Sequence, residues 1–204
     1  VQEHGFLAAD QYNAVRLMDY NIGYYFNELV ANSHYRDNTI FVMYGDHNDR
    51  SLSSTHMGYS EKLYLDKHHV PLIIHAPGLL KEPGVIDRPA SLVDVLPTAL
   101  GLAGLPYENR TMGRDLLNTE SPSYALTFGG DRTNRPTIGL LGEKYWMGMY
   151  YDGEDAALHP LDNPSLENRL GREDAPEFAE YESLLSGMYE ASRYMMHHNR
   201  KDTQ

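Results

Sequence analysis

The sequence predicts an α/β fold that starts with part of a parallel sheet and ends with a smaller antiparallel α+β lobe. Two nearly continuous apolar runs, residues 39–44 and 70–75, are typical of strands buried on both faces under helices. Helical periodicity precedes the first run and follows the second, as in α/β proteins. After residue 118 the pattern changes to short β-like runs separated by glycine turns, which favours antiparallel pairing.

The first helix is predicted over residues 7–30, where apolar side chains recur at steps of three and four. They are Val15, Met18, Ile22, Tyr25, Phe26, Leu29 and Val30. Residues 48–69 are polar and rich in Ser and His, and a loop of that length is commonly functional. A second helix is predicted to begin at Asp94, because Pro97 then lies in the first turn, where its missing N–H breaks no bond. This helix ends near Gly104.

The C-terminal lobe is predicted to hold three short antiparallel strands and one helix. The strands correspond to residues 124–128, 137–141 and 144–151, and the helix to residues 177–198. One face of that helix carries Phe178, Tyr181, Leu184, Leu185, Met188 and Met195. We therefore divide the chain into a first domain of residues 1–118 and a second domain of residues 119–204.

The composition excludes several classes of function. The chain has 17 Lys and Arg against 29 Asp and Glu, a net charge of −12. We expect no nucleic-acid partner, because phosphate contacts need clustered cations. The absence of cysteine excludes disulfides, thiolate metal sites and cysteine nucleophiles within these 204 residues. No apolar window is long enough to span a bilayer, and the start lacks an initiator Met and a signal pattern, as in a processed product or fragment.

Asp46 and His47 directly follow the first apolar run, at the predicted carboxyl end of a strand. Open α/β sheets bind their ligands at that end. Gly45 allows the chain to turn there, so two adjacent side chains need not point to opposite faces. A carboxylate and a neutral imidazole together suit a divalent metal ion. The alternative is a loop carboxylate hydrogen-bonded to a neighbouring histidine, since an Asp-His pair also arises by chance.

Five segments, in order, resemble the sulfatase and lipoteichoic-acid-synthase branch of the alkaline phosphatase superfamily. Residues 37–47 are similar to its "DNT-apolar-strand-DH" segment and residues 70–78 to its "VPLII-x-x-PG" strand. Residues 91–104, 112–117 and 159–168 resemble its "D-x-x-PT-x-x-x-LAG" helix, its "G-x-DLL" segment and its "D-x-DP-x-E-x-N" segment. The resemblance implies that the first domain is the C-terminal part of an alkaline-phosphatase-like parallel-sheet sandwich.

The resemblance also implies a metal-dependent hydrolase or transferase that acts on sulfate esters or on phosphodiesters of the phosphoglycerol type. Asp46 and His47 match the metal-binding pair of the family, with Mn²⁺, Mg²⁺, Ca²⁺ or Zn²⁺ as the cofactor. His56 falls in a loop where some members place a substrate-contacting histidine, and Lys62 near a sulfate-binding lysine. The alternative for both is a solvated loop side chain. Asp49 or His56 could also complete the set of metal ligands.

The half of the family fold that carries the nucleophile has no counterpart in this sequence. Neither Thr39 nor Thr111 has the family context of a nucleophile, so no catalytic residue is assigned and the isolated chain is expected to be inactive. The expected partners are an anionic ester substrate and the missing N-terminal half of the catalytic domain. Self-association through the exposed face left by that half is a further expectation.

The resemblance implies a location on the extracytoplasmic face of a bacterial membrane, with an anchor outside this chain. A different class of function stays open beside the enzyme. The chain would then be a non-catalytic α/β module with a binding or structural role.

Overall fold

The computed structural model describes residues 6, 8–47, 63, 65, 68–129, 135–165 and 167–198. The chain divides into two compact units. The first consists of Val1–Ile86 with Ala99–Pro106, and the second of Asp87–Thr98 with Tyr107–Gln204. This grouping by contacts differs from the domain division at residue 118, which stays a prediction.

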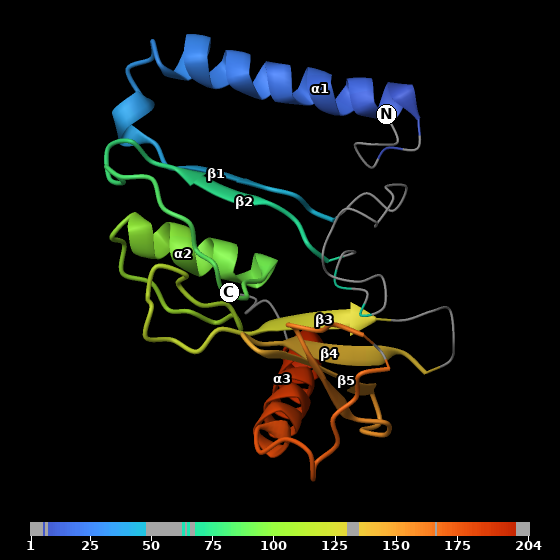
Figure 1. Ribbon diagram of the computed structural model, residues 1–204. Helices are drawn as coiled ribbons and strands as arrows, with labels where there is room; N and C mark the ends of the chain where they lie inside the picture. Colours follow the sequence, from blue (N-terminus) through green and yellow to red (C-terminus); the bar gives the residue numbers. More distant parts are fainter. Residues whose placement is uncertain are drawn as a thin grey trace. The chain divides into compact units, whose positions relative to one another are not determined.

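The first unit contains a long helix and a two-stranded sheet (Figure 1). Helix α1 spans Ala9–Tyr24 and continues into one π-helical turn, η2, at Tyr25–Val30. These bounds confirm the helix predicted over residues 7–30. A 3₁₀ turn, η3 (Arg36–Asn38), then leads into strand β1, which spans Phe41–Tyr44. Strand β2 spans Leu72–His75.

Both apolar runs form strands, as predicted, but the parallel pairing expected for them is wrong. Strands β1 and β2 pair antiparallel, with Phe41 opposite His75 and Tyr44 opposite Leu72. An apolar run predicts that a strand is buried. It contains no information on the direction of the neighbouring strand. The direction depends on how the intervening chain returns, which a local pattern does not specify.

The second helix begins close to the predicted residue. A 3₁₀ turn, η7, covers Leu92–Asp94, and helix α2 follows at Val95–Leu102 with Pro97 in its first turn. The side chain of Asp94 reaches back to accept the N–H of Ser91 at 2.8 Å. Ser91 and Asp94 therefore belong to one capped turn at this helix start.

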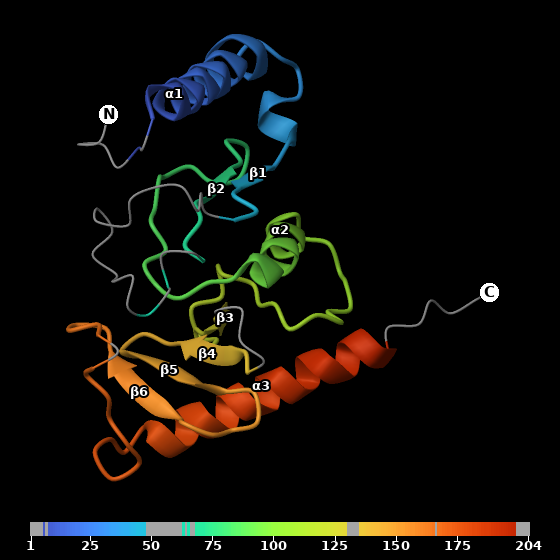
Figure 2. The same ribbon diagram turned by 90° about the vertical axis from the view of Figure 1, so that its right-hand side faces the viewer.

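The C-terminal part of the second unit is a four-stranded antiparallel sheet with a helix against it (Figure 2). The strands follow chain order: β3 (Ala125–Gly129), β4 (Thr137–Leu141), β5 (Tyr145–Tyr150) and β6 (Ala157–Pro160). Helix α3 spans Phe178–His198. The antiparallel lobe, three of its strands and its helix confirm the prediction, whereas β6 was not expected.

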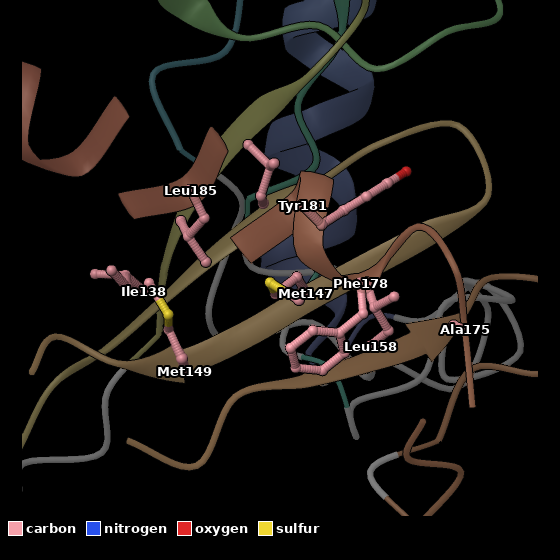
Figure 3. Packing of buried hydrophobic residues seen from close by; sticks show 9 residues of the cluster. Ile138, Met147, Met149, Leu158, Ala175, Phe178, Tyr181 and Leu185 are labelled. Atoms are coloured by element: carbon pink, nitrogen blue, oxygen red, sulfur yellow. The ribbon is translucent and has the colours of Figure 1, made fainter. Parts of the chain in front are cut away.

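The core of this lobe lies between α3 and one face of the sheet (Figure 3). Met147 on β5, Leu158 on β6 and Leu185 on α3 are completely buried there. On the opposite face, the indole of Trp146 lies across two glycines of the sheet, Gly139 and Gly148, where a Cβ atom would overlap with it. The indole N–H donates to Thr127 Oγ1 at 3.0 Å. Both faces of the sheet are therefore closely packed.

Among the described helices, none combines the length and the apolar character that crossing a bilayer requires.

Candidate metal site

The candidate site lies where β1 ends. The N–H of Gly45 still donates to the carbonyl of Pro71 at 3.1 Å, so the ladder with β2 extends one residue beyond the strand. A Cβ atom at Gly45 would lie 3.1 Å from the Cβ of Val70, so a larger residue would push against the segment that leads into β2. The chain then bends at Asp46 and His47. The bend frees the two side chains from the alternation of a regular strand, as the sequence predicted.

The structure brings the side chains of Asp46 and His47 together. Asp46 Oδ2 and His47 Nε2 are 3.6 Å apart, and Asp46 Oδ1 accepts the backbone N–H of His47 at 3.0 Å. The side chains are 87% and 70% exposed, respectively. Two ligands of one cation, each about 2.0–2.5 Å from it, lie roughly 3–4 Å from each other. The pair therefore has a separation that suits a shared divalent ion, and one that equally suits a simple carboxylate–imidazole contact.

The ligand set at this site is incomplete in the part of the chain that the structure describes. No group of three or more His, Asp or Glu side chains there is arranged to hold a metal ion. Asp49 and His56, which could add ligands, and Lys62, a candidate for substrate binding, lie outside the described residues. Because divalent ions take four or more ligands, Asp46 and His47 alone would hold one weakly.

Two other described histidines serve packing or local hydrogen bonds. His75 on β2 has its ring centroid 5.2 Å from that of Phe26 and 5.9 Å from that of Phe41, within an aromatic cluster. His159 on β6 is buried, and its Nδ1 lies 2.9 Å from the carbonyl oxygen of Ser165. Burial lowers the pKa of His159, so its neutral form is favoured. Neither residue adds a ligand to the candidate site.

Thr111, which the sequence analysis did not assign as a nucleophile, has a structural role in a turn. Its hydroxyl donates to Asn109 Oδ1 at 2.8 Å and accepts the N–H of Gly113 at 3.1 Å. The hydroxyl therefore donates one hydrogen bond and accepts another inside the turn.

A buried carboxylate at the predicted start of the second helix has a larger structural role. Asp94 is 1% exposed, and its two oxygens accept the N–H groups of Ser91 and Arg114, each at 2.8 Å. The guanidinium of Arg114 lies 3.3 Å from the same carboxylate and donates to the carbonyl of Tyr124 at 2.6 Å. Asp94 thus connects the start of α2 to the segment that enters β3. The signal was available, since both residues lie within the family-like segments 91–104 and 112–117.

Sequence comparisons place this chain among sulfatase-like proteins. The family model described as "Sulfatase" matches residues 7–105, which include α1, both strands of the first sheet and the Asp46–His47 pair. Lipoteichoic acid synthase 2 of Bacillus subtilis is 32% identical over 152 residues, which are 69% of this chain and 22% of that protein. Arylsulfatase K of Danio rerio is 33% identical over 126 residues, or 56% of this chain and 24% of that protein.

A solved structure has a similar fold. The phosphonate monoester hydrolase from Silicibacter pomeroyi aligns with a TM-score of 0.55 over 88% of this chain and 38% of its own, at 21% identity. This likeness confirms the α/β class and the sulfatase-type fold that the sequence predicts. The chain spans 22% and 24% of the two curated relatives.

Proposed function

Residues 7–105 of this chain match the sulfatase family model, and from that match we propose that the chain is the metal-binding portion of a hydrolase or transferase acting on sulfate esters or phosphodiesters. One observation carries the proposal. Asp46 Oδ2 and His47 Nε2 lie 3.6 Å apart at the end of β1, inside the segment that matches the family. Both side chains are exposed, so neither is needed to fill the core.

Asp46 and His47 would hold Mn²⁺, Mg²⁺, Ca²⁺ or Zn²⁺ through one carboxylate oxygen and one imidazole nitrogen. Such an ion, when bound, supplies positive charge that polarises the oxygens of a sulfate or phosphate ester. The backbone N–H of His47 holds Asp46 Oδ1, which leaves Oδ2 directed at the imidazole. The local turn therefore presents both ligand atoms on the same side before any ion arrives, and this reduces the entropy lost on binding.

The nucleophile and the remaining metal ligands would come from outside this chain, which spans 22% and 24% of the two curated relatives. We favour phosphodiesters over sulfate esters, because Tyr44-Gly45-Asp46-His47 is closer to the lipoteichoic-acid-synthase type of motif than to the "SDHG" of sulfatases. The same resemblance supports an extracytoplasmic location at a bacterial membrane. The isolated chain would bind metal weakly and turn over no ester.

Isothermal titration of the 204-residue chain with Mn²⁺, Ca²⁺ and Zn²⁺ tests the metal site. We expect one weak site, whose affinity falls by roughly tenfold or more in Asp46→Asn and in His47→Gln. Asp37→Asn is the matched control, since Asp37 is an exposed carboxylate of the same unit that lies near Arg36. Its binding isotherm should match that of the unmodified chain.

The same titration distinguishes the enzyme from the alternative function. A chain that binds none of the three ions, or that binds them equally well in Asp46→Asn and His47→Gln, has no metal site at this pair. The non-catalytic α/β module would then be the better description. Among the described residues, the lack of a third ligand at the site is the observation that favours this alternative.

A further inference from the structure

The turn between β5 and β6 contains Asp152-Gly153, the only Asp-Gly dipeptide of the sequence. An Asp-Gly link is prone to backbone isomerisation, because glycine has no side chain to hinder attack of its nitrogen on the aspartyl carboxyl group. Gly153 has a positive φ of 87°, and the Asp152 side chain is 37% exposed, so water reaches it. The turn therefore places a reactive dipeptide at an accessible position.

The guanidinium of Arg135 holds two carboxylates of this turn. Its Nη2 lies 2.7 Å from Asp152 Oδ2 and 2.6 Å from Glu154 Oε2. The same guanidinium lies over the ring of Tyr150, 4.2 Å from the ring centroid. Two ion pairs and one ring contact share a single side chain, so Arg135 has a defined position over the turn and is not a freely moving surface cation.

Both reacting groups of the dipeptide are held in hydrogen bonds. Asp152 Oδ1 accepts the backbone N–H of Glu154 at 3.2 Å, while Oδ2 pairs with Arg135. The N–H of Gly153, whose nitrogen would have to attack, donates to the carbonyl of Tyr150 at 2.8 Å. A rotation of the carboxyl group towards this nitrogen would have to break its bonds to Glu154 and Arg135.

The same contacts keep the carboxyl group of Asp152 in its less reactive form. Isomerisation proceeds through the neutral carboxylic acid, since a carboxylate resists attack by a nucleophile. Desolvation raises the pKa of Asp152, but the hydrogen bonds from Arg135 and from the Glu154 N–H outweigh this effect, so the pKa is lowered. The neutral acid is therefore rarer here than in an unpaired aspartate at the same pH.

We propose that Asp152-Gly153 is a site of isoaspartate formation and that Arg135 suppresses this reaction in the folded chain. In the first step the Gly153 nitrogen forms a bond to Cγ of the protonated Asp152 side chain, and the N–H proton and the acid hydroxyl leave as water. Water then adds to the backbone carbonyl carbon of Asp152 in the resulting succinimide and breaks its bond to the nitrogen. The chain afterwards continues through the side-chain carbonyl, and neither oxidant nor reductant is needed.

The isomer would lengthen the backbone of the turn by one methylene group. The turn closes through hydrogen bonds from Gly153 N–H to the Tyr150 carbonyl and from Tyr150 N–H to the Glu154 carbonyl, at 2.8 and 2.9 Å. Both bonds depend on the normal length of this segment. The last register pair of β5 and β6, Gly148 opposite Ala157, lies next to them. We therefore expect the modification to loosen this end of the sheet.

Incubation of the 204-residue chain in mildly acidic buffer, followed by peptide mapping with electron-transfer fragmentation, tests the proposal. We expect isoaspartate at position 152 to form roughly fivefold faster or more in Arg135→Gln, because a charge-assisted contact is lost at a partly exposed site. Arg169→Gln is the matched control, since Arg169 pairs with Asp155 of the same turn at 2.7 Å. Its rate should equal that of the unmodified chain. Asp152→Glu should form no isomer, because its longer side chain would have to close a larger ring.

The pH profile of the rate separates an effect on the carboxyl group from a merely looser turn. Without Arg135 the carboxyl group of Asp152 takes up its proton more easily, so the rate should begin to rise at a higher pH than in the unmodified chain. An unshifted profile, an unchanged rate in Arg135→Gln or an equal rise in Arg169→Gln would overturn the proposal. Equal rates in the folded chain and in urea would also overturn it. The Trp146 fluorescence of each variant checks that the C-terminal sheet stays folded.

Discussion

The C-terminal lobe and the first unit differ in how completely each buries its own apolar residues. In the lobe of β3–β6 and α3, Leu140, Met147, Leu158 and Leu185 are 0% exposed. In the unit of α1, β1 and β2, helix α1 has no buried residue at all. Both α1 and α3 nevertheless show helical apolar periodicity in the sequence. Similar local patterns thus lead to a finished core in one region and to an open apolar groove between α1 and β1 in the other.

This difference shows which region of the chain lacks packing partners for its apolar residues. Most of the stability of a helix comes from packing its apolar face, so α1 gains little from forming alone. Asp46 and His47, which the proposed chemistry needs, both lie in the unit with the open groove. The lobe with the finished core contributes no candidate ligand. The candidate site therefore lies in the region whose packing is least complete.

Hydrogen exchange of the chain alone should show the largest contrast between the two regions. Because β4 and β5 pack on a closed core, we expect their amides to exchange at least about 1,000-fold more slowly than those of α1. Mass spectrometry at neutral pH measures both regions in one sample. Equal protection of the α1 and β5 amides would contradict the predicted difference in packing between the two regions.

Removal of the buried carboxylate of Asp94 should strongly destabilise the second unit. Asp94→Ala leaves the backbone N–H groups of Ser91 and Arg114 without their acceptor and removes the carboxylate that pairs with the Arg114 guanidinium. We expect the free energy of unfolding to fall by about 3–5 kcal/mol. Urea denaturation followed by the fluorescence of Trp146, the one tryptophan of the chain, measures it.

Glu108→Ala is the control for Asp94→Ala. Glu108 pairs with Arg110 on the surface, where solvent screens the interaction. The urea midpoint should not change in this variant. A midpoint change in Glu108→Ala as large as that in Asp94→Ala would mean that burial of the carboxylate is not the cause.

A matched pair of leucine truncations compares the two helices directly. Leu185→Ala on α3 opens a cavity in the finished core and should lower the free energy of unfolding by about 2–5 kcal/mol. Leu17→Ala on α1 removes a largely exposed side chain and should change it by less than about 0.5 kcal/mol. Urea denaturation with helix content by circular dichroism as the second probe covers both regions. A large loss in Leu17→Ala would show that α1 is already packed in the isolated chain.

The smallest expected effect is a pH dependence confined to the C-terminal lobe. Burial lowers the pKa of His159 below the ordinary value of 6.5, which the unfolded chain keeps. Between those two values the unfolded state binds more protons, so stability is complete above pH 6.5 and falls as the pH falls towards the folded pKa. One proton limits the slope to about 1.4 kcal/mol per pH unit.

Urea midpoints between pH 7.5 and pH 5 check this effect. His159→Asn keeps an N–H donor for Ser165 and removes the titration, so its pH dependence should be shallower than that of the unmodified chain. An unchanged slope in His159→Asn would show that other groups cause the loss.

Periodicity and turn residues predict the positions of most helices and strands. The helix over residues 7–30 and the strands near residues 137–141 and 144–151 lie where their patterns placed them, because steps of three and four, or a run between two glycine turns, are local properties. Strand β6 is not predicted, since Ala157–Pro160 is a short run next to polar residues. The antiparallel pairing of β1 and β2 is also not predicted, because the relative direction of two strands is not a local property of the sequence.

The candidate site was predicted in part. The order of residues along the chain was enough to propose Asp46 and His47 as one pair, because a glycine before them permits a bend at a strand end. The family-like segments drew attention to the regions of Asp94 and Arg114. They did not show that Asp94, directly before α2, is buried against Arg114, because the two lie 20 residues apart and meet only through folding. His56 stays a prediction, since it lies outside the described residues.

The sequence by itself predicted the α/β class, the position of most elements, the likeness to sulfatases and the choice of Asp46 and His47 as candidate ligands, because each depends on neighbouring residues or on short motifs. Only the tertiary structure decided which apolar residues are covered, since burial depends on what packs against an element and not on its own pattern. It closed the core under α3 and left the groove beside α1 open. It also set Asp46 Oδ2 and His47 Nε2 3.6 Å apart, because that distance depends on how the chain bends after β1.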